Sequence, residues 1–282
     1  MTASKKIAFQ GELGANSHEA CQTYFPDYEP VPCLTFEEAF MAMQSGSCAL
    51  GMIPVENSIA GRVGDVHHLL PASGLRIIGE AFKPIRFHLM ANPGVTLDTV
   101  TTAVSMPIAL YQCRNNIKAL GLGTQAAGDT AGAAKALSEN PDSTKAAVAP
   151  ALAAKIYGLD ILKSDLEDDI TNTTRFLVMT AAKDAEPPPA GVPSVTSFVF
   201  RVRNMPAALY KALGGFATNG VNLTKLESYM ESGAFAATMF YAEVDGRPQD
   251  PPLAHALEEL TFFADHVELL GAYPADPFRL KA

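Results

Sequence analysis

Residues 183–193 read Lys-Asp-Ala-Glu-Pro-Pro-Pro-Ala-Gly-Val-Pro, and this stretch decides how the chain divides. Proline lacks a backbone N–H donor and fixes φ, so Pro187, Pro188, Pro189 and Pro193 suit neither a helix interior nor a sheet interior. The stretch therefore predicts a linker between two domains. A chain of 282 residues with 48% hydrophobic residues is long enough for both.

Before the linker, short apolar runs alternate with helical patterns. Residues 7–9, 48–55 and 146–149 are apolar runs of strand length. Thr35 and Glu38 stand in capping-box register at the start of a helix. This alternation predicts an α/β region whose strands are covered on both faces, and it is compatible with two α/β lobes.

After the linker the order of elements changes to strand, helix, strand, strand, helix, strand. Apolar positions alternate with period two in the strands and fall on one face in the helices. The expected strands are 198–202, 223–229, 235–244 and 267–270, and the expected helices are 209–216 and 253–260. The order predicts a ferredoxin-like βαββαβ domain, and analogy with other appended domains of this kind suggests a regulatory role.

Charge and composition exclude several classes of partner. A net charge of −9 without a basic stripe argues against nucleic acid and against an acidic membrane surface. The first residues lead into no apolar signal core, and no apolar run is long enough to span a bilayer. Cys21, Cys33, Cys48 and Cys113 are scattered without metal-ligand spacing. We expect a cytoplasmic protein with reduced cysteines and no bound metal.

The segment Asn172-Thr173-Thr174-Arg175-Phe176 places a hydroxyl, a guanidinium and an aromatic ring at the start of an apolar strand. Arginine offers a fork of donors that matches a carboxylate, and threonine offers a proton that can be donated or shared. The segment predicts a site for a small anion. The alternative is that Arg175 makes a surface ion pair and that Thr174 only begins the strand.

Residues 11–17 follow another predicted strand and lead into a helix. The glycines at both ends of Gly11-Glu12-Leu13-Gly14 favour a turn whose backbone donors could hold an anion. Asn16 stands in capping-box register with Glu19. A simple strand-to-helix turn is the alternative.

Residues 53–63 form the third loop, at the carboxyl end of a predicted buried strand. Asn57 or Ser58 is expected to cap a helix that runs on through residues 59–69, with Glu56 beside the cap. Open α/β sheets place ligands at such strand ends, although a cap without further role is the alternative. Neither G-x-G-x-x-G nor G-x-x-x-x-G-K occurs, so dinucleotide and triphosphate sites lack their glycine scaffolds.

Taken in order, these motifs resemble the prephenate dehydratase family. They are Gly11-x-x-Gly14-x-x-Ser17, then Gly51-Met52-Ile53-Pro54-Val55-Glu56-Asn57-Ser58, Gln112-Cys113, Asp129-Thr130-Ala131 and Asn172-x-Thr174-Arg175-Phe176. The resemblance covers nearly the whole chain and includes no segment of chorismate mutase type, which implies a monofunctional enzyme. It implies a two-lobed α/β catalytic domain, periplasmic-binding-protein-like, in residues 1–182, a linker in residues 183–193, and a ferredoxin-like ACT regulatory domain in residues 194–282.

The resemblance also implies a reaction, in which prephenate loses water and carbon dioxide to give phenylpyruvate in L-phenylalanine biosynthesis. It implies no metal and no organic cofactor. Thr174 is then the donor to the leaving hydroxyl, with Ser58 nearby, and Glu56 is the rival acid because a carboxyl beside apolar residues could stay protonated. The substrate-binding residues implied are Asn16, Ser17, Asn57, Ser58, Gln112, Arg175 and Phe176.

In the second domain, residues 204–209 and 222–228 resemble the segments with which ACT domains of this family bind phenylalanine between subunits. The residues implied are Ala207, Ala208, Leu209, Asn222, Leu223, Glu227 and Ser228. Two departures weaken the match: Ala207 stands where the family has glycine, and Tyr229-Met230 stands where it has Arg-Pro. A homodimer or homotetramer through the ACT domain is expected.

Two alternatives to prephenate dehydratase stay open. Arogenate dehydratase acts on a substrate whose side chain carries an amine instead of a keto group, and no residue of the sequence separates the two substrates. The second is a non-enzymatic protein that binds a small anion between two α/β lobes.

Overall fold

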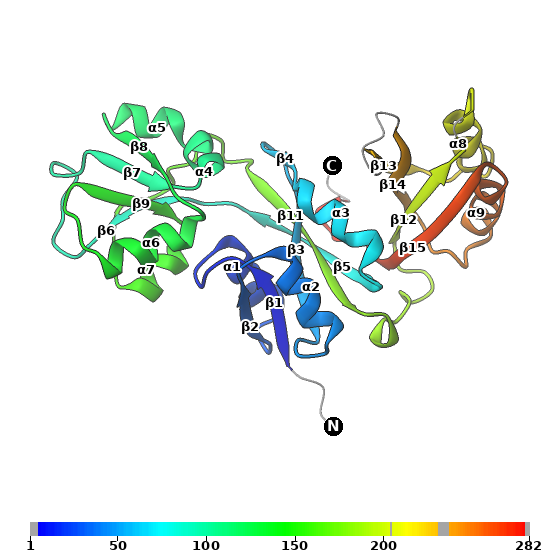
Figure 1. Cartoon of the computed structure of the whole chain (residues 1–282), viewed down its shortest axis with the longest axis horizontal. Helices are drawn as coiled ribbons and strands as arrows, with labels where there is room; N and C mark the ends of the chain where they lie inside the picture. The colour runs from blue at the N-terminus through cyan, green and yellow to red at the C-terminus, as the bar shows by residue number, and fades with distance from the viewer. Residues whose placement is uncertain (1–4, 204, 231–236, 280–282) are drawn as a thin grey trace. The chain divides into compact units, whose positions relative to one another are not determined.

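The computed structural model describes residues 5–203, 205–230 and 237–279 (Figure 1). Contacts divide the chain into two compact units, residues 1–67 with 81–176 and residues 68–80 with 177–282. This division differs from the predicted catalytic domain in residues 1–182 and the predicted ACT domain in residues 194–282. Those domain boundaries stay a prediction. None of the described helices combines the length and the apolar character needed to cross a membrane.

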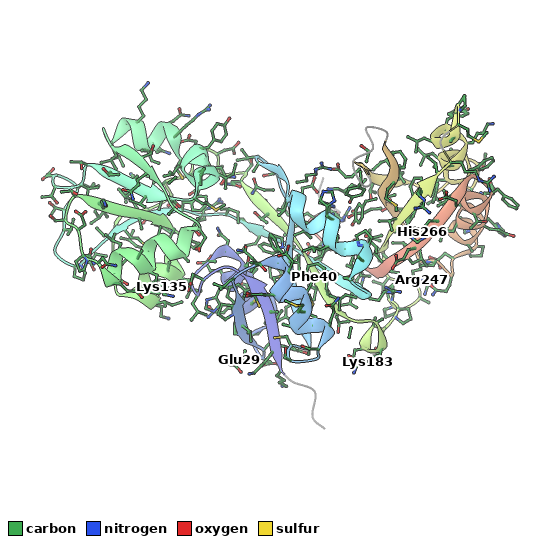
Figure 2. The ribbon with its side chains drawn as sticks, viewed as in Figure 1. Glu29, Phe40, Lys135, Lys183, Arg247 and His266 are labelled. Carbon is green, nitrogen blue, oxygen red and sulfur yellow. The ribbon has the colours of Figure 1, made fainter. Side chains whose placement is uncertain are left out.

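The first sheet has six strands in the order β2-β1-β3-β11-β5, with β4 paired to β3. Strand β1 is parallel to both β2 and β3. Its residues Ile7, Ala8 and Phe9 are fully buried, as expected for a strand covered on both faces. Phe40, labelled in Figure 2, lies on the buried face of helix α2. The elements are β1 (Lys6–Gln10), α1 (Asn16–Tyr24), β2 (Glu29–Cys33), α2 (Phe36–Gln44), β3 (Leu50–Asn57), β4 (Gly61–Arg62), α3 (Gly64–Ala72), β5 (Leu75–Pro84) and β11 (Thr173–Ala181).

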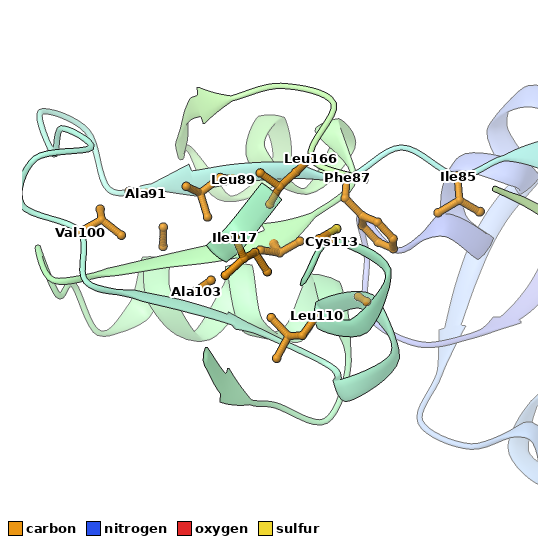
Figure 3. Close-up of a cluster of buried hydrophobic side chains, with 13 residues drawn as sticks. Ile85, Phe87, Leu89, Ala91, Val100, Ala103, Leu110, Cys113, Ile117 and Leu166 are labelled. Atoms are coloured by element: carbon orange, nitrogen blue, oxygen red, sulfur yellow. The ribbon is translucent and has the colours of Figure 1, made fainter. Parts of the chain in front are cut away.

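The second sheet has five strands in the order β10-β6-β9-β7-β8. Alternate residues of β6 enter different apolar clusters: Leu89 and Ala91 join the cluster of Figure 3, whereas Met90 joins an alanine-rich cluster with α6. Both faces of this sheet are therefore covered. The elements are β6 (His88–Ala91), β7 (Thr102–Ser105), α4 (Pro107–Gln112), α5 (Arg114–Ala119), β8 (Gly123–Ala126), α6 (Thr130–Glu139), β9 (Lys145–Ala149), α7 (Ala151–Tyr157) and β10 (Asp160–Lys163).

The predicted helix caps have mixed outcomes. The Thr35 side chain accepts from the Glu38 amide at 3.2 Å, so that cap is confirmed. The Asn16 cap is wrong, because α1 begins after Ala15, which has no side-chain cap. Glu19 Oε1 instead accepts from the Leu152 amide at 3.2 Å.

The helix expected directly after Asn57 is also wrong. Asn57 Oδ1 accepts from the amides of Ile59 at 3.0 Å and Ala60 at 2.8 Å, which folds the chain back into a turn. The chain then returns as β4, with Gly61 opposite Asn57 and Arg62 opposite Glu56. Helix α3 begins only at Gly64.

The second unit contains a four-stranded sheet in the order β13-β14-β12-β15. Its βαββαβ order confirms the predicted succession of elements, although residues 235 and 236 of the third predicted strand lie outside the described residues. Phe198 stacks on Phe216 of helix α8, with ring centroids 5.7 Å apart. Residues 185–193 contain neither helix nor strand, as the prolines predict. The elements are β12 (Ser194–Val202), α8 (Ala208–Thr218), β13 (Leu223–Met230), β14 (Ala237–Asp245), α9 (Pro251–Phe263) and β15 (Ala264–Pro274), after a 3-10 turn at Ala182–Asp184.

Candidate active site

Asn57 is the centre of a hydrogen-bonded cluster in the first unit. Its Nδ2 donates to Asn172 Oδ1 at 2.8 Å and to Thr174 Oγ1 at 3.0 Å. Its Oδ1 accepts from Gln112 Nε2 at 3.0 Å. The end of β3, the start of β11 and the end of α4 therefore bring together side chains that lie more than fifty residues apart in the chain.

The bond from Asn57 fixes the role of the Thr174 hydroxyl. Because the Thr174 oxygen accepts the amide hydrogen of Asn57, its own hydrogen is available to a further acceptor. Accepting one hydrogen bond also polarises the O–H group and strengthens it as a donor. The cluster can thus present a neutral hydrogen-bond donor at a defined position.

Thr174 lines a cavity of about 420 Å³ in the same unit. That volume suits a single small ligand. Six of the residues expected at the site line the cavity: Asn16, Ser17, Asn57, Gln112, Thr174 and Phe176. Met106, Ile108, Ile85 and Phe87 contribute apolar wall, and Arg62 and Asp129 contribute charge.

Arg175 does not line this cavity. Successive side chains of a strand point to opposite faces, and on β11 it is Thr174 and Phe176 that line the cavity. Arg175 is 5% exposed, and its guanidinium lies 5.8 Å from the centre of the Phe82 ring. Arg175 is therefore not among the residues that line this cavity, and its role in holding a substrate carboxylate stays a prediction.

Ser58 and Glu56 do not line the cavity either. Ser58 clamps the start of β11: its amide donates to the Thr173 carbonyl at 2.9 Å, and its Oγ accepts from the Thr173 amide at 3.0 Å. Its hydroxyl also donates to the Thr171 carbonyl at 3.2 Å. Ser58 therefore positions the strand that carries Thr174, and Glu56 lies opposite Arg62 in the β3–β4 pair.

The loop before α1 brings backbone donors to the cavity. The first amides of a helix have no intrahelical partner, and no side chain caps those of α1. Asn16 and Ser17 of this first turn line the cavity. Asn16 Oδ1 is buried and has no hydrogen-bond partner among the described residues. A buried amide oxygen without a partner is costly, so a donor group on a ligand would satisfy it.

His18 and Gly14 hold that loop in place. The Gly14 amide donates to His18 Nδ1 at 2.9 Å, and the imidazole stacks on Phe9 with centroids 5.4 Å apart. Burial lowers the pKa of His18, while Glu19 acts in the opposite direction. Gly14 has φ +94°, and an added Cβ would lie 2.7 Å from the Ala153 Cα. The loop therefore requires both a glycine and a neutral imidazole.

Sequence reasoning missed Arg62 and Asp129 as lining residues. Arg62 was hidden because residues 58–63 suggested a helix, whereas β4 turns its side chain toward the cavity. Asp129 was named in a family motif and expected to open a helix, without a role at the site, and its Oδ1 does accept from the Gly132 amide at 2.6 Å. The order of charges in the sequence gave no signal that these two loops meet at one cavity.

The residues expected to bind an effector lie in the second unit. Ala207 precedes α8 in a left-handed conformation, with φ 60°. Leu209 and Leu223 pack against the same apolar cluster, and Ala208 belongs to it. Asn222 Nδ2 donates to Asp245 Oδ2 at 2.8 Å, and Glu227 lies 3.8 Å from Lys225. Ser228 is exposed, and Asn204 lies outside the described residues.

Comparison with known proteins gives a consistent family. The prephenate dehydratase family model matches residues 7–184. A bifunctional N-acyl-homoserine lactone acylase/prephenate dehydratase from Komagataeibacter europaeus is 47% identical over 281 residues and covers 100% of each chain. Arogenate dehydratase 2 from Petunia hybrida is 37% identical over an alignment of 285 positions, which covers 96% of this chain and 72% of the plant protein. A prephenate dehydratase from Arthrobacter aurescens in complex with L-Phe has a TM-score of 0.88 at 28% identity, covering 96% of this chain and 90% of that chain. The protein belongs to the prephenate dehydratase family.

Proposed function

We propose that this protein converts prephenate to phenylpyruvate, carbon dioxide and water. The observation that carries the proposal is the Thr174 hydroxyl, which lines the cavity while its oxygen accepts a hydrogen bond from Asn57. The reaction needs a donor to the leaving hydroxyl, because hydroxide departs slowly without a proton. Family membership supports the same chemistry.

Aromatisation of the ring drives the reaction. The bond between the ring and its carboxylate breaks, and its electron pair enters the ring as the carboxylate leaves as carbon dioxide. The ring hydroxyl departs on the other side, takes up one proton and leaves as water. That proton comes through the Thr174 hydroxyl and is replaced from solvent. Thr174 is a weak acid, so its contribution is a hydrogen bond that strengthens as negative charge develops on the departing oxygen.

The other lining residues then have distinct tasks. Asn57 fixes the Thr174 hydroxyl, and Gln112 fixes Asn57. Phe176, Met106 and Ile108 supply apolar wall that suits a six-membered ring and displaces water. Ser58 acts on the position of β11 instead of on the substrate.

The experiment compares two adjacent threonines. Thr174→Ala removes the donor, so we expect kcat for phenylpyruvate formation to fall by about 100- to 10,000-fold with little change in KM. Thr173→Ala is the matched control, since its hydroxyl bonds to the Thr171 carbonyl at 3.0 Å and it does not line the cavity. Equal activities of the two variants would overturn the proposal.

Regulation by phenylalanine is part of the proposal, through an ACT domain in residues 194–282 that follows a two-lobed catalytic domain in residues 1–182. The βαββαβ order supports the ACT assignment, and the related Arthrobacter aurescens protein is described in complex with L-Phe. Such a domain would also join subunits into a homodimer or homotetramer. Titration of phenylalanine against activity and sedimentation tests both points, and no change in either would remove the effector from the proposal.

The names of two relatives suggest two further activities to test for this protein. The Komagataeibacter europaeus relative is named as an acylase as well as a dehydratase, and the Petunia hybrida relative as an arogenate dehydratase. The wild-type protein should be incubated separately with prephenate, arogenate and an N-acyl-homoserine lactone. The products to detect are phenylpyruvate, phenylalanine and free homoserine lactone. If none forms but prephenate binds tightly, the protein is a carrier of a small anion.

A further inference from the structure

The cavity has few charges for a substrate that carries two carboxylates. Among the described residues that line it, Arg62 and Asp129 alone are charged. The Asp129 carboxylate accepts from the Gly132 amide at 2.6 Å and so serves the start of α6. Arg62 is therefore the cation within this lining that can face an anionic ligand. A guanidinium binds a carboxylate through two parallel hydrogen bonds, which fixes orientation as well as position.

The β3–β4 hairpin ties Arg62 to the hydroxyl cluster. Gly61 pairs with Asn57 and Arg62 pairs with Glu56, and the Val63 amide donates to the Val55 carbonyl at 2.9 Å. The turn between the strands is closed by Asn57 Oδ1, the same side chain that donates to Thr174. One short hairpin thus holds both Arg62 and Asn57, and Asn57 in turn donates to Thr174 on β11.

Glu56 gives Arg62 a charged neighbour on the hairpin. Residues directly opposite in an antiparallel pair have Cβ atoms about 5 Å apart, and opposite charges there attract. Glu56 does not line the cavity, so its attraction for Arg62 acts from outside the cavity.

We propose that Arg62 anchors a carboxylate of the substrate, the task that Arg175 was expected to perform. This inference rests on the proposed dehydratase function. It assigns Arg62 to binding and Thr174 to the chemical step, so the two residues should affect different kinetic constants.

The test is Arg62→Gln measured against Arg114→Gln. Arg114 is exposed on α5 and lies over the Tyr111 ring at 4.6 Å, outside the cavity, so both variants lose one positive charge from the same unit. We expect Arg62→Gln to raise KM for prephenate about 10- to 100-fold with kcat within about threefold, and Arg114→Gln to leave both unchanged. Arg62→Lys should recover part of the loss, since a lysine keeps the charge but not the fork.

The outcomes separate this inference from the proposed function. A wild-type protein without phenylpyruvate formation would refute the dehydratase proposal itself. Turnover by the wild type with an unchanged KM in Arg62→Gln would overturn only the anchoring role. A fall in kcat without a change in KM would likewise overturn it, because Arg62 would then act on the chemical step.

Discussion

Two polar clusters of this protein consist of different kinds of side chain, neutral in one and charged in the other. The cluster around Asn57 in the first unit is neutral and joins amides to a hydroxyl beside an open cavity. The second unit instead buries charge: the side chains of Glu80 and Glu243 are 0% and 1% exposed, and Arg279 donates to them at 2.6 and 2.7 Å. The Tyr241 hydroxyl donates to Glu243 at 2.6 Å as well.

This difference determines whether each cluster can exchange its hydrogen-bond partners. Neutral amides and hydroxyls can exchange one hydrogen-bond partner for another at small cost, so they can accept a ligand and release a product. Buried carboxylates cannot lose a cation without a large penalty, so Arg279 holds the segment after β15 firmly. The Asn57 cluster is therefore suited to changing hydrogen-bond partners, and the Arg279 cluster is suited to keeping them.

The largest expected effect is on the charged cluster. Arg279→Met leaves two buried carboxylates without their cation, and we expect the free energy of unfolding to fall by about 3–5 kcal/mol. The control is Arg201→Met in the same unit: the Arg201–Asp265 pair, at 2.7 Å, has side chains 40% and 44% exposed, and its loss should cost less than about 1 kcal/mol. Urea unfolding of both variants tests this, and equal losses would contradict the contrast between buried and exposed pairs.

The second effect concerns the neutral cluster and appears in activity. Asn57→Asp keeps an oxygen for the amides of Ile59 and Ala60 but removes the donor to Thr174. We expect kcat to fall by about 100-fold or more, whereas stability changes by less than about 2 kcal/mol. Asn115→Ala is the control, since that side chain is exposed. A variant that loses its fold while keeping kcat per folded molecule would show that Asn57 is structural only.

Sequence reasoning predicted interactions between residues close in the chain better than interactions between distant residues. The Thr35 cap could be predicted because its hydrogen bond spans three residues. The partners of Asn57 lie 115 and 117 residues away, so only the folded chain reveals them. Arg175 was expected beside Thr174 at one site, but adjacent side chains of a strand point to opposite faces, and Arg175 does not line the cavity.

Local patterns can also support two structures equally well. Asn57 and Ser58 suit both a helix cap and a turn, and the turn formed because Asn57 Oδ1 bonds to the amides of Ile59 and Ala60. Arg62 was missed for the same reason, since a helix would have carried it away from the strand end. Family resemblance implied Asn57, Gln112 and Thr174 as site residues, but it could not say which of their side chains are hydrogen-bonded to each other.

The third effect is a pH dependence of the free energy of unfolding, which arises from His18 in α1. Burial lowers the pKa of His18 below its ordinary value of 6.5, so the unfolded chain binds a proton more readily than the folded chain does. The contribution of His18 is complete above pH 6.5 and is lost as pH falls through the lowered pKa, with a slope of at most about 1.4 kcal/mol per pH unit. The free energy of unfolding, plotted against pH between pH 5 and pH 8, should therefore differ in slope between the wild type and His18→Gln. Parallel curves would show that the Gly14–His18 bond does not depend on a neutral ring.

The smallest effect compares two turns that both use a left-handed backbone. Gly14 in the loop before α1 has φ +94° and is the glycine that this conformation favours, whereas Ala207 before α8 has φ 60° with a side chain. Because Cβ is unfavourable in that region, Ala207→Gly should stabilise the second unit by about 0.5–1 kcal/mol. Ala217→Gly is the control with the opposite sign, since Ala217 is exposed within α8 and glycine there should cost about 1 kcal/mol. Destabilisation by Ala207→Gly would mean that the alanine methyl group contributes packing that outweighs the strain, and the departure from the family glycine would then be a gain in stability.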